Sequence, residues 1–235
     1  MTTAIIVCVL SILAVIAIVV GLAFAVKKIN EENRHANCDD EMSWSEKRTA
    51  VGFDQALENC QNKLIINNLI LPGLYDPKHT TQVDTLIIST RGVFVIETKS
   101  WHGEVYGSPD QKEWTIYYDN GESHKAYNPT WQNNGHLKRV KQLIQRDTDL
   151  DVDKIRFIPM VVFYHGDIDH VEADNCFSLD QACDFIQTFG DVLDDETVNI
   201  LKEEFTGYKS HPASSLEEHS AYVQSLKDGE ENDEF

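Results

Sequence analysis

Residues 92–103 read GVFVIETKSWHG and place a glutamate and a lysine at the end of an apolar strand. The run from Val93 to Ile96 is large and apolar at every position, which is typical of a strand buried on both faces. Glu97 and Lys99 are two residues apart and therefore share one face of that strand. Burying such charges is costly unless they are paired, hydrogen-bonded or bound to a metal. The stretch therefore contains either a structural ion pair or a reaction centre.

A second apolar strand, expected over Gln82–Ser89, lies only two residues before this one. A two-residue connection predicts an antiparallel hairpin in which the last residue of the first strand faces Gly92. In that register Asp84 lies opposite Glu97. Two facing carboxylates are unfavourable unless one is protonated or a cation lies between them. The pattern is consistent with a divalent metal on Asp84 and Glu97, and equally with a structural network of both residues with Lys99.

The length of the chain suits one globular domain of ordinary size. Asn128 is a good N-cap and Pro129 a good first residue for a helix that runs to about residue 145. The other expected helices span about 45–62, 179–189 and 196–205, and the other expected strands span 64–71, 105–106, 114–118 and 156–164.

Residues 3–26 form an uncharged apolar run that exceeds the length of about 20 residues needed to cross a bilayer. The run predicts one transmembrane helix. A signal peptide is the alternative, but the start of the chain lacks the basic residues typical of one. Lys27, Lys28 and Arg34 follow the run, so the positive-inside rule places the domain in the cytoplasm. We therefore expect a single-pass cell-membrane protein whose polar stalk spans 27–44.

The formal charge of −19 is unevenly distributed. Residues 45–145 contain 11 Lys and Arg against 11 Asp and Glu, whereas the chain from Arg146 onward contains 6 against 23. The neutral middle segment is therefore compatible with a nucleic-acid partner. We expect the domain to span 45–207 and an acidic, disordered tail to span 208–235. The five cysteines show no C-x-x-C pair and no zinc-ligand spacing, which favours reduced thiols.

Several short blocks resemble the nuclease-related (NERD) domain. The resemblance covers about residues 49–143 and rests on the blocks at 69–72, 81–84, 92–103 and 128–129, together with Gln132 and His136. The family looks like a branch of the PD-(D/E)XK nuclease superfamily. That likeness implies an α/β, restriction-endonuclease-like core with a mixed central β-sheet flanked by helices. It also implies attack of water on a phosphodiester bond of nucleic acid, most often DNA, assisted by Mg²⁺ or Mn²⁺.

The resemblance also assigns roles to residues of this chain. Asp84 and Glu97 would ligate the metal, and oxygen ligands suit magnesium. Lys99 would orient the attacking water or stabilise charge on the phosphate. Gln132 and His136 are four residues apart on one helix face, and they resemble the Gln-x-x-x-Tyr motif of related nucleases. An accessory role in the site and ordinary core packing are both open for His136.

One position departs from the family pattern. A Gly-Glu pair usually opens the first helix of the family, and its glutamate can join the metal site. Here the aligned pair is Gly52 and Phe53, so Asp54 or Glu58 would have to substitute after a small shift. Three functions follow as hypotheses: a membrane-anchored, metal-dependent nuclease, a catalytically inactive module that binds nucleic acid or a protein partner at the membrane, or a membrane scaffold that acts only through its acidic C-terminal part.

Two further patterns have mainly structural interpretations. The segment His165–His170 (HGDIDH) contains metal-ligating residue types, but it follows a buried strand and we interpret it as a solvated loop. Trp101, Trp114 and Trp131 have rings that can stack on bases. Packing in the core or at its rim is the interpretation we favour for these tryptophans.

Overall fold

The structure is a computed structural model that describes residues 44–76, 79–209 and 219–225. The expected transmembrane run 3–26, and the expected stalk apart from its last residue, lie outside the described residues. Within the described residues, no helix is both long enough and apolar enough to cross a membrane. In the expected tail, residues 208–209 end a helix and residues 219–225 are helical.

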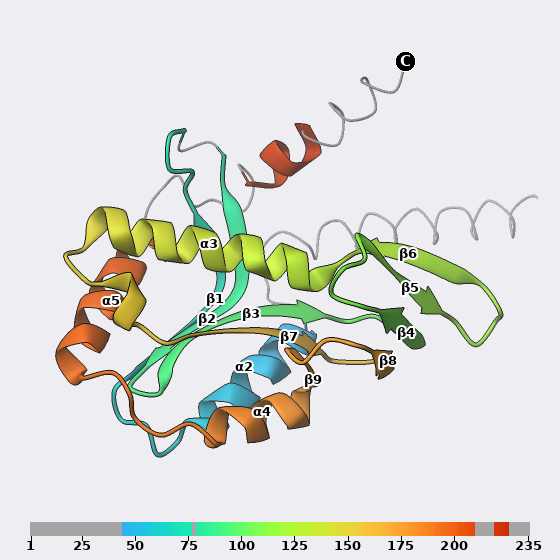
Figure 1. The fold of residues 1–235 in the computed structure, drawn as a ribbon, viewed down its shortest axis with the longest axis horizontal. Coiled ribbons are helices and arrows are strands. Elements are labelled where there is room, and N and C mark those ends of the chain that lie inside the picture. The colour runs from blue at the N-terminus through green and yellow to red at the C-terminus, as the bar shows by residue number, and fades with distance from the viewer. Residues whose placement is uncertain (1–43, 77–78, 210–218, 226–235) are drawn as a thin grey trace, which may run out of the picture. The chain divides into compact units, whose positions relative to one another are not determined.

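The central sheet contains five strands in the order β1-β2-β3-β7-β9 (Figure 1). The first three strands, β1 (Lys63–Leu71), β2 (Thr81–Ser89) and β3 (Gly92–Lys99), form an antiparallel meander. β7 (Phe157–Phe163) then pairs with β3 in parallel, and β9 (Cys176–Ser178) pairs with β7 in parallel. The sheet is therefore mixed, as expected, although the short strand β9 was not predicted.

Helices cover both faces of this sheet. α3 (Pro129–Asp147) and α5 (Asp195–Lys209) pack on one face, and α2 (Trp44–Ala56) and α4 (Leu179–Gln187) pack on the other (Figure 1). α2 was expected to continue to residue 62, but the chain turns after Ala56 and enters β1 at residue 63. The result is the mixed α/β arrangement that the family resemblance implies.

The alternation of side chains along β3 assigns each residue to one of these faces. Val93 and Val95 belong to the hydrophobic cluster beneath α3 and α5. Phe94 and Ile96 belong to the cluster beneath α2 and α4. Because successive side chains of a strand point to opposite faces, Glu97 continues the row of the two valines and faces α3.

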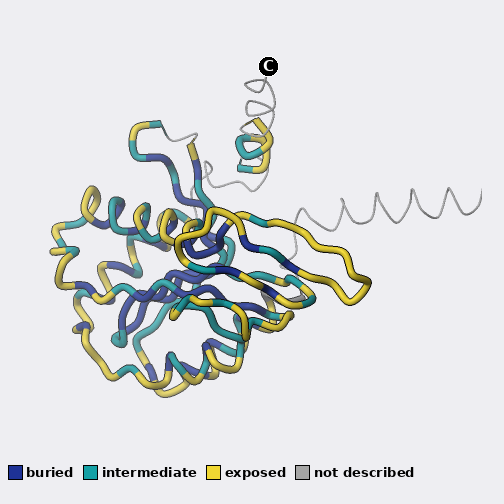
Figure 2. Tube along the Cα trace, turned by 45° about the vertical axis from the view of Figure 1, so that its right-hand side comes forward, coloured by how far each residue is buried: buried dark blue, intermediate teal, exposed yellow. Residues whose placement is uncertain are grey.

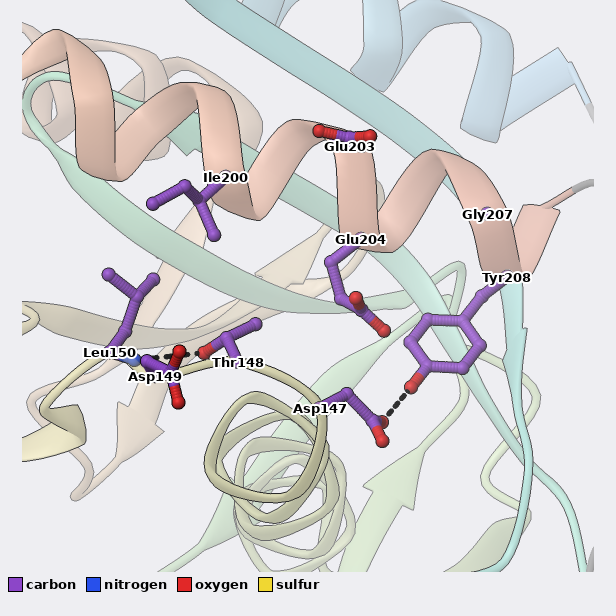
Figure 3. Close-up of a pocket in the computed structure, with 9 residues that line it drawn as sticks. All are labelled: Asp147, Thr148, Asp149, Leu150, Ile200, Glu203, Glu204, Gly207 and Tyr208. Atoms are coloured by element: carbon purple, nitrogen blue, oxygen red, sulfur yellow. Dashed lines mark hydrogen bonds between the residues drawn. The ribbon is translucent and has the colours of Figure 1, made fainter.

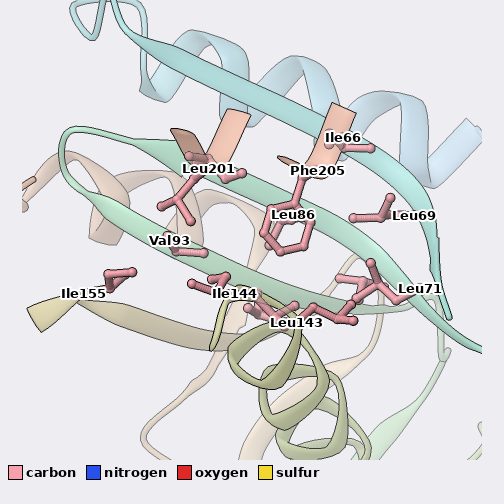
Figure 4. Packing of buried hydrophobic residues seen from close by; sticks show 14 of the residues in the cluster. Ile66, Leu69, Leu71, Leu86, Val93, Leu143, Ile144, Ile155, Leu201 and Phe205 are labelled. Carbon is pink, nitrogen blue, oxygen red and sulfur yellow. The ribbon is translucent and has the colours of Figure 1, made fainter. Parts of the chain in front are cut away.

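The cluster on the α3 face contains only apolar side chains. Figure 4 shows Leu143 and Ile144 of α3 facing the strands, with Leu201 and Phe205 of α5 completing the layer over Leu86. All five side chains are fully buried. This dry layer fixes α3 against the sheet, and the first turns of the same helix carry the polar residues of the candidate site.

A second sheet has the order β6-β5-β4-β8. Its strands are β4 (Glu104–Gly107), β5 (Glu113–Tyr117), β6 (Ser123–Tyr127) and β8 (Asp167–Val171). One face packs against the end of the central sheet through a cluster that includes Trp114. The other face is open, and the hairpin of β5 and β6 is exposed along much of its length (Figure 2). The chain therefore forms two mixed sheets, where one had been expected.

The interpretation of His165–His170 as a loop was wrong for its last four residues. Asp167–Val171 is strand β8, which pairs in parallel with β4. Its side chains are mostly polar and exposed, so it lacks the apolar alternation by which strands are found in a sequence. The described cysteines Cys60, Cys176 and Cys183 are free thiols, in agreement with the expected reduced state.

Candidate active site

The β2–β3 hairpin has the register expected from its two-residue connection. Its pairs run from Ser89–Gly92 to Thr85–Ile96. Gly92 has a φ of 135°, and a Cβ there would lie 2.7 Å from Ile158 Cδ1. A glycine is therefore required where the turn enters β3. The register brings the acidic ends of both strands to the same edge of the sheet.

Asp84 enters the site where β2 separates from β3. The Thr98 N–H, which would face a main-chain carbonyl if the ladder continued, instead donates to Asp84 Oδ2 at 2.8 Å. Asn68, in the neighbouring strand β1, has a φ of 52°. Asparagine tolerates this left-handed conformation better than most residues. The local distortion of β1 and β2 thus frees the Asp84 side chain to approach the end of β3.

Glu97 lies at the centre of the polar cluster and is 2% exposed. Lys99 Nζ lies 2.6 Å from Glu97 Oε1 and also donates to Gln132 Oε1 at 3.0 Å. His136 Nε2 lies 3.1 Å from Glu97 Oε2. Gln132 and His136 therefore face the site from one side of α3, as their spacing predicts. The structure brings Glu97, Lys99 and both helix residues together.

Two asparagines hold α3 in place over these residues. Asn128 caps the helix, because its Oδ1 accepts the Thr130 N–H at 2.9 Å. Asn133 is fully buried, and its side-chain amide donates to Val95 O and to Met160 O, both at 2.9 Å. Asn133 thereby links α3 to β3 and β7 together. Sequence reasoning predicted the cap but missed Asn133.

Thr81 is a further residue of the site that sequence reasoning missed. Its Oγ1 lies 3.0 Å from His136 Nδ1, on the far side of the ring from Glu97. Because an ionised Glu97 accepts a hydrogen bond, His136 Nε2 carries a proton in this arrangement. The hydroxyl of Thr81 therefore holds the ring in position. Thr81 lies in the same sequence block as Asp84, which is the one signal that pointed to it.

The two carboxyl groups have opposite pKa shifts. Burial, and then the negative charge of Glu97, raise the pKa of Asp84 from 3.8 to about 7, although the Thr98 N–H and Lys99 oppose this. Burial also acts to raise the pKa of Glu97, but the hydrogen bond with His136 and the charge of Lys99 outweigh it and lower that pKa. Glu97 is therefore ionised more readily than Asp84, for which Lys99 and His136 do not outweigh burial and the charge of Glu97.

These two carboxylates fit a hard divalent cation. Mg²⁺ keeps several of its waters and is commonly held by one or two protein carboxylates. The raised pKa of Asp84 shows that its ionised form would gain from a positive charge placed beside it. Among the described residues, no group of three or more His, Cys, Asp or Glu side chains is arranged to hold a metal ion. Within these residues, the site therefore offers a cation two carboxylates rather than a complete set of protein ligands.

Asp54 and Glu58, the two residues that could substitute for the family's glutamate, are not part of this cluster. Phe53 is fully buried in the cluster that contains Phe94, on the face of the sheet opposite to Glu97. Asp54 is 2.8 Å from Lys63, which pairs with Ser89 at the hairpin end of β2. That end is five strand residues, or about 16 Å, from Asp84. Glu58 is exposed beyond the end of the same helix. The small shift expected for Asp54 or Glu58 is therefore not seen.

The three tryptophans pack as expected rather than forming one surface. Trp114 is fully buried, and its indole N–H donates to Ser108 O at 2.9 Å. Trp131 is 39% exposed and donates to Pro109 O at 2.6 Å. Trp101 is the tryptophan that borders the site, because Lys99 Nζ lies 5.7 Å from the centre of its ring.

A hollow of about 710 Å³ lies between the end of α3 and α5, outside the cluster around Glu97. Figure 3 shows the carboxylates of Glu204 and Asp147 beside the ring of Tyr208. The Asp147 carboxylate pairs with Arg146 at 2.7 Å and accepts a hydrogen bond from the Tyr208 hydroxyl. Four of the nine residues that line the hollow are acidic and none is Lys or Arg, so the hollow is unsuited to phosphate groups.

Comparisons with known proteins agree with the geometry. Residues 43–164 match the family model described as the nuclease-related domain, NERD. An uncharacterized protein of Bacillus anthracis is 40% identical over 67 residues, which cover 28% of this chain. The match spans 31% of the length of that relative. No solved structure matches the chain. Because the family model covers more than half of the chain, this protein belongs to the nuclease-related domain family, within the PD-(D/E)XK-like nuclease superfamily.

Proposed function

We propose that this protein hydrolyses phosphodiester bonds in nucleic acid, with DNA as its main substrate, in a reaction that depends on Mg²⁺ or Mn²⁺. The observation that carries the proposal is the position of Asp84 beside the Glu97–Lys99 pair. The pKa of Glu97 is lowered, Lys99 Nζ lies 2.6 Å from its carboxylate, and the pKa of Asp84 is raised to about 7 by burial and by Glu97. Perturbed carboxyl groups beside a lysine are typical of functional sites.

The side chains of the cluster have separable roles in this proposal. Glu97 and Asp84 hold the cation. Lys99 is fixed from two directions, by Glu97 and by the Gln132 side chain, so its ammonium group is preorganised beside the carboxylates. A preorganised positive charge stabilises the negative charge that develops on phosphate oxygens during hydrolysis. His136 maintains Glu97 in its ionised form and is itself held by Thr81.

When bound, the cation would lower the pKa of the attacking water and reduce repulsion between that water and the phosphate. Two carboxylates at the site also explain why such a cation is needed, since they alone would repel the substrate. Lys99 offsets part of this repulsion, and its contact with Gln132 keeps it directed toward α3.

The location of the reaction belongs to the same proposal. We propose that residues 3–26 anchor the protein in the cell membrane and that the nuclease domain faces the cytoplasm, where nucleic acid is available. The support is the length of the uncharged run and the basic residues Lys27, Lys28 and Arg34 that follow it. The amount of full-length protein in membranes after a carbonate wash tests this part.

Cleavage of supercoiled plasmid by the full-length protein tests the reaction. Cleavage is expected with Mg²⁺ or Mn²⁺ and is expected to stop when EDTA is added. Asp84→Asn and Lys99→Gln should each lower the rate by orders of magnitude while the protein stays folded. Glu113→Gln is the matched control, because Glu113 is an exposed carboxylate on the second sheet. Cleavage that continues in EDTA contradicts the metal dependence.

A second function, binding of nucleic acid or a protein without catalysis, is favoured by one observation. In the family resemblance the hydrophobic residue Phe53 aligns with the usual glutamate, and its side chain is fully buried. A folded protein that binds DNA but cleaves neither DNA nor RNA with either cation would support this alternative over the nuclease.

A further inference from the structure

The open face of the second sheet carries a row of three rings on neighbouring strands. Tyr106 of β4 lies between Tyr117 of β5 and His170 of β8. The Tyr106 and His170 rings are stacked, with centroids 4.3 Å apart and planes 7° apart. Tyr117 meets Tyr106 edge to face at 5.3 Å. The Tyr106 hydroxyl donates to Glu104 Oε2 at 3.0 Å. Tyr106 is therefore fixed in place before any ligand arrives, which lowers the entropic cost of binding.

These rings line a groove of about 630 Å³. The groove also contains the carboxylates of Glu104 and Glu172, and none of the described residues that line it is lysine or arginine. Asp167 adds a third carboxylate nearby, because it lies beside Glu104 in the backbone register of the parallel strands β4 and β8. The groove is thus aromatic and negatively charged, whereas the proposed active site combines its carboxylates with a lysine.

This combination selects for cations and against phosphates. Ring faces attract ammonium and guanidinium groups, and neighbouring carboxylates strengthen that attraction. The backbone of a nucleic acid would be repelled by Glu104 and Glu172. The volume of about 630 Å³ lies in the range of sites for ligands far larger than a single ammonium or guanidinium group. The ligand should therefore be a peptide. Its cationic side chain would contact the rings, and its backbone would fill the rest of the groove.

We propose that this groove binds an extended, arginine- or lysine-containing peptide segment of a protein partner. The cationic side chain lies against the row of rings of which Tyr106 is the middle member, and it is neutralised by Glu172 and Glu104. The site is on a different sheet from Glu97 and Lys99, and it does not depend on nuclease activity. It gives the protein a means of recruiting a basic partner.

Binding of labelled peptides to the full-length protein tests the proposal. The probe is a fluorescein-labelled octapeptide of alternating arginine and glycine, measured by fluorescence anisotropy at about 150 mM salt, where weak surface attraction is screened. The matched probe replaces each arginine with neutral citrulline. We expect the citrulline peptide to bind at least about tenfold more weakly, since it loses both the cation–π and the carboxylate attraction.

Variants of the protein locate the binding. Tyr106→Ala and Glu172→Gln should each weaken binding of the arginine peptide by about tenfold. Tyr106→Phe keeps the ring and should retain most of the affinity. Tyr75→Ala removes a tyrosine that is 99% exposed outside the groove, and Glu203→Gln removes a carboxylate from the hollow beside α5. Neither of these control variants should change the affinity.

Several results would overturn the proposal. Equal affinity for the arginine and citrulline peptides would do so, as would unchanged binding in Tyr106→Ala with the fold intact by circular dichroism. A comparable loss of affinity in Glu203→Gln would show only general attraction to an acidic protein. An oligothymidine that binds the wild type and not Tyr106→Ala, while the arginine peptide does not bind, would assign the groove to base stacking instead.

Discussion

The central sheet and the second sheet each contain a glutamate–lysine pair, and the two pairs differ in burial. In the central sheet, Glu97 and Lys99 are 2.6 Å apart, and their side chains are 2% and 17% exposed. In the second sheet, Glu113 and Lys125 are 3.8 Å apart, and their side chains are 51% and 71% exposed. The residue types are the same, but water screens the second pair and is almost excluded from the first.

This difference explains why one sheet holds the candidate active site. Burial makes the charge state of each carboxyl group depend on its neighbours, so Asp84 and Glu97 shift in opposite directions. On the second sheet, exposed carboxylates act mainly through the field they create over a surface. The first environment suits catalysis, and the second suits recognition of a partner. Substitutions and changes of pH show how far burial alone accounts for the contrast.

The largest effect is expected for Phe53→Glu, which restores the family's usual residue. Phe53 is fully buried among apolar side chains, so the substitution loses its packing and places a charge in the core. We expect a loss of more than about 5 kcal/mol in the free energy of unfolding, measured by denaturant titration. A folded variant that cleaves DNA faster than wild type would show instead that α2 can turn this position toward Asp84.

The next largest effect is expected in the pH dependence of stability when divalent cations are absent. The folded-state pKa of Asp84 is raised from 3.8 to about 7, so the folded protein binds the proton more tightly than the unfolded chain does. This group therefore lowers stability progressively as pH rises from about 4 to 7, by on the order of 4 kcal/mol in total. Melting temperature in EDTA should fall over this window. The lowered pKa of Glu97 acts in the opposite direction, with stability lost as pH falls through that pKa.

Asp84→Asn isolates the contribution of Asp84 to the dependence of melting temperature on pH. The variant keeps an acceptor for the Thr98 N–H but cannot ionise, so its profile in EDTA should be flatter and its melting temperature at pH 8 higher than that of wild type. Adding Mg²⁺ should raise the melting temperature of wild type and leave the variant nearly unchanged. An identical pH profile for the two proteins would contradict the assignment of the raised pKa to Asp84.

Lys99→Ala and Lys125→Ala compare the two lysines directly. Lys99→Ala leaves the buried Glu97 with His136 as its remaining partner, and we expect a loss of about 3 kcal/mol without divalent cation. Mg²⁺ should restore part of this stability but not the rate of cleavage. Lys125→Ala should change stability by less than about 0.5 kcal/mol. If Mg²⁺ rescues none of the loss in Lys99→Ala, the Glu97–Lys99 pair is structural.

A small effect is also expected for Asp54→Asn. Asp54 is 68% exposed and pairs with Lys63 at the hairpin end of the sheet, so the loss in stability should be below about 1 kcal/mol. The dependence of cleavage on Mg²⁺ concentration should match that of wild type. A clear weakening of Mg²⁺ dependence would place Asp54 among the ligands after all.

The sequence predicted those parts of the molecule in which a local signal and a buried surface agree. The two-residue connection and the apolar runs determine the register of β2 and β3, and the Asn128 cap determines where α3 begins. From these two elements the neighbourhood of Glu97, Lys99, Gln132 and His136 follows.

The rest depended on contacts that no local pattern encodes. β8 and β6 consist largely of polar, exposed residues, so their pairing is visible only once β4 and β5 are in place. Thr81 acts through one hydrogen bond with His136, and Asn133 acts through two hydrogen bonds, to Val95 and Met160, which are all distant in the sequence. The position of Asp54 depends on the rotation of α2, which the burial of Phe53 fixes.

The parallel pairing of β3 with β7 has a consequence for the order of folding. β3 ends at Lys99 and β7 begins at Phe157, with the hairpins of the second sheet and α3 between them. The β2–β3 hairpin closes a two-residue loop, whereas the β3–β7 contact must close a long one, and long-range contacts form slowly. We therefore expect Glu97 and Lys99 to be present on a hairpin before β7 joins its edge. Newly made chains would pass through a stage in which these charges are still hydrated. The free-energy cost of burying them would then arise late in folding, when β7 joins β3.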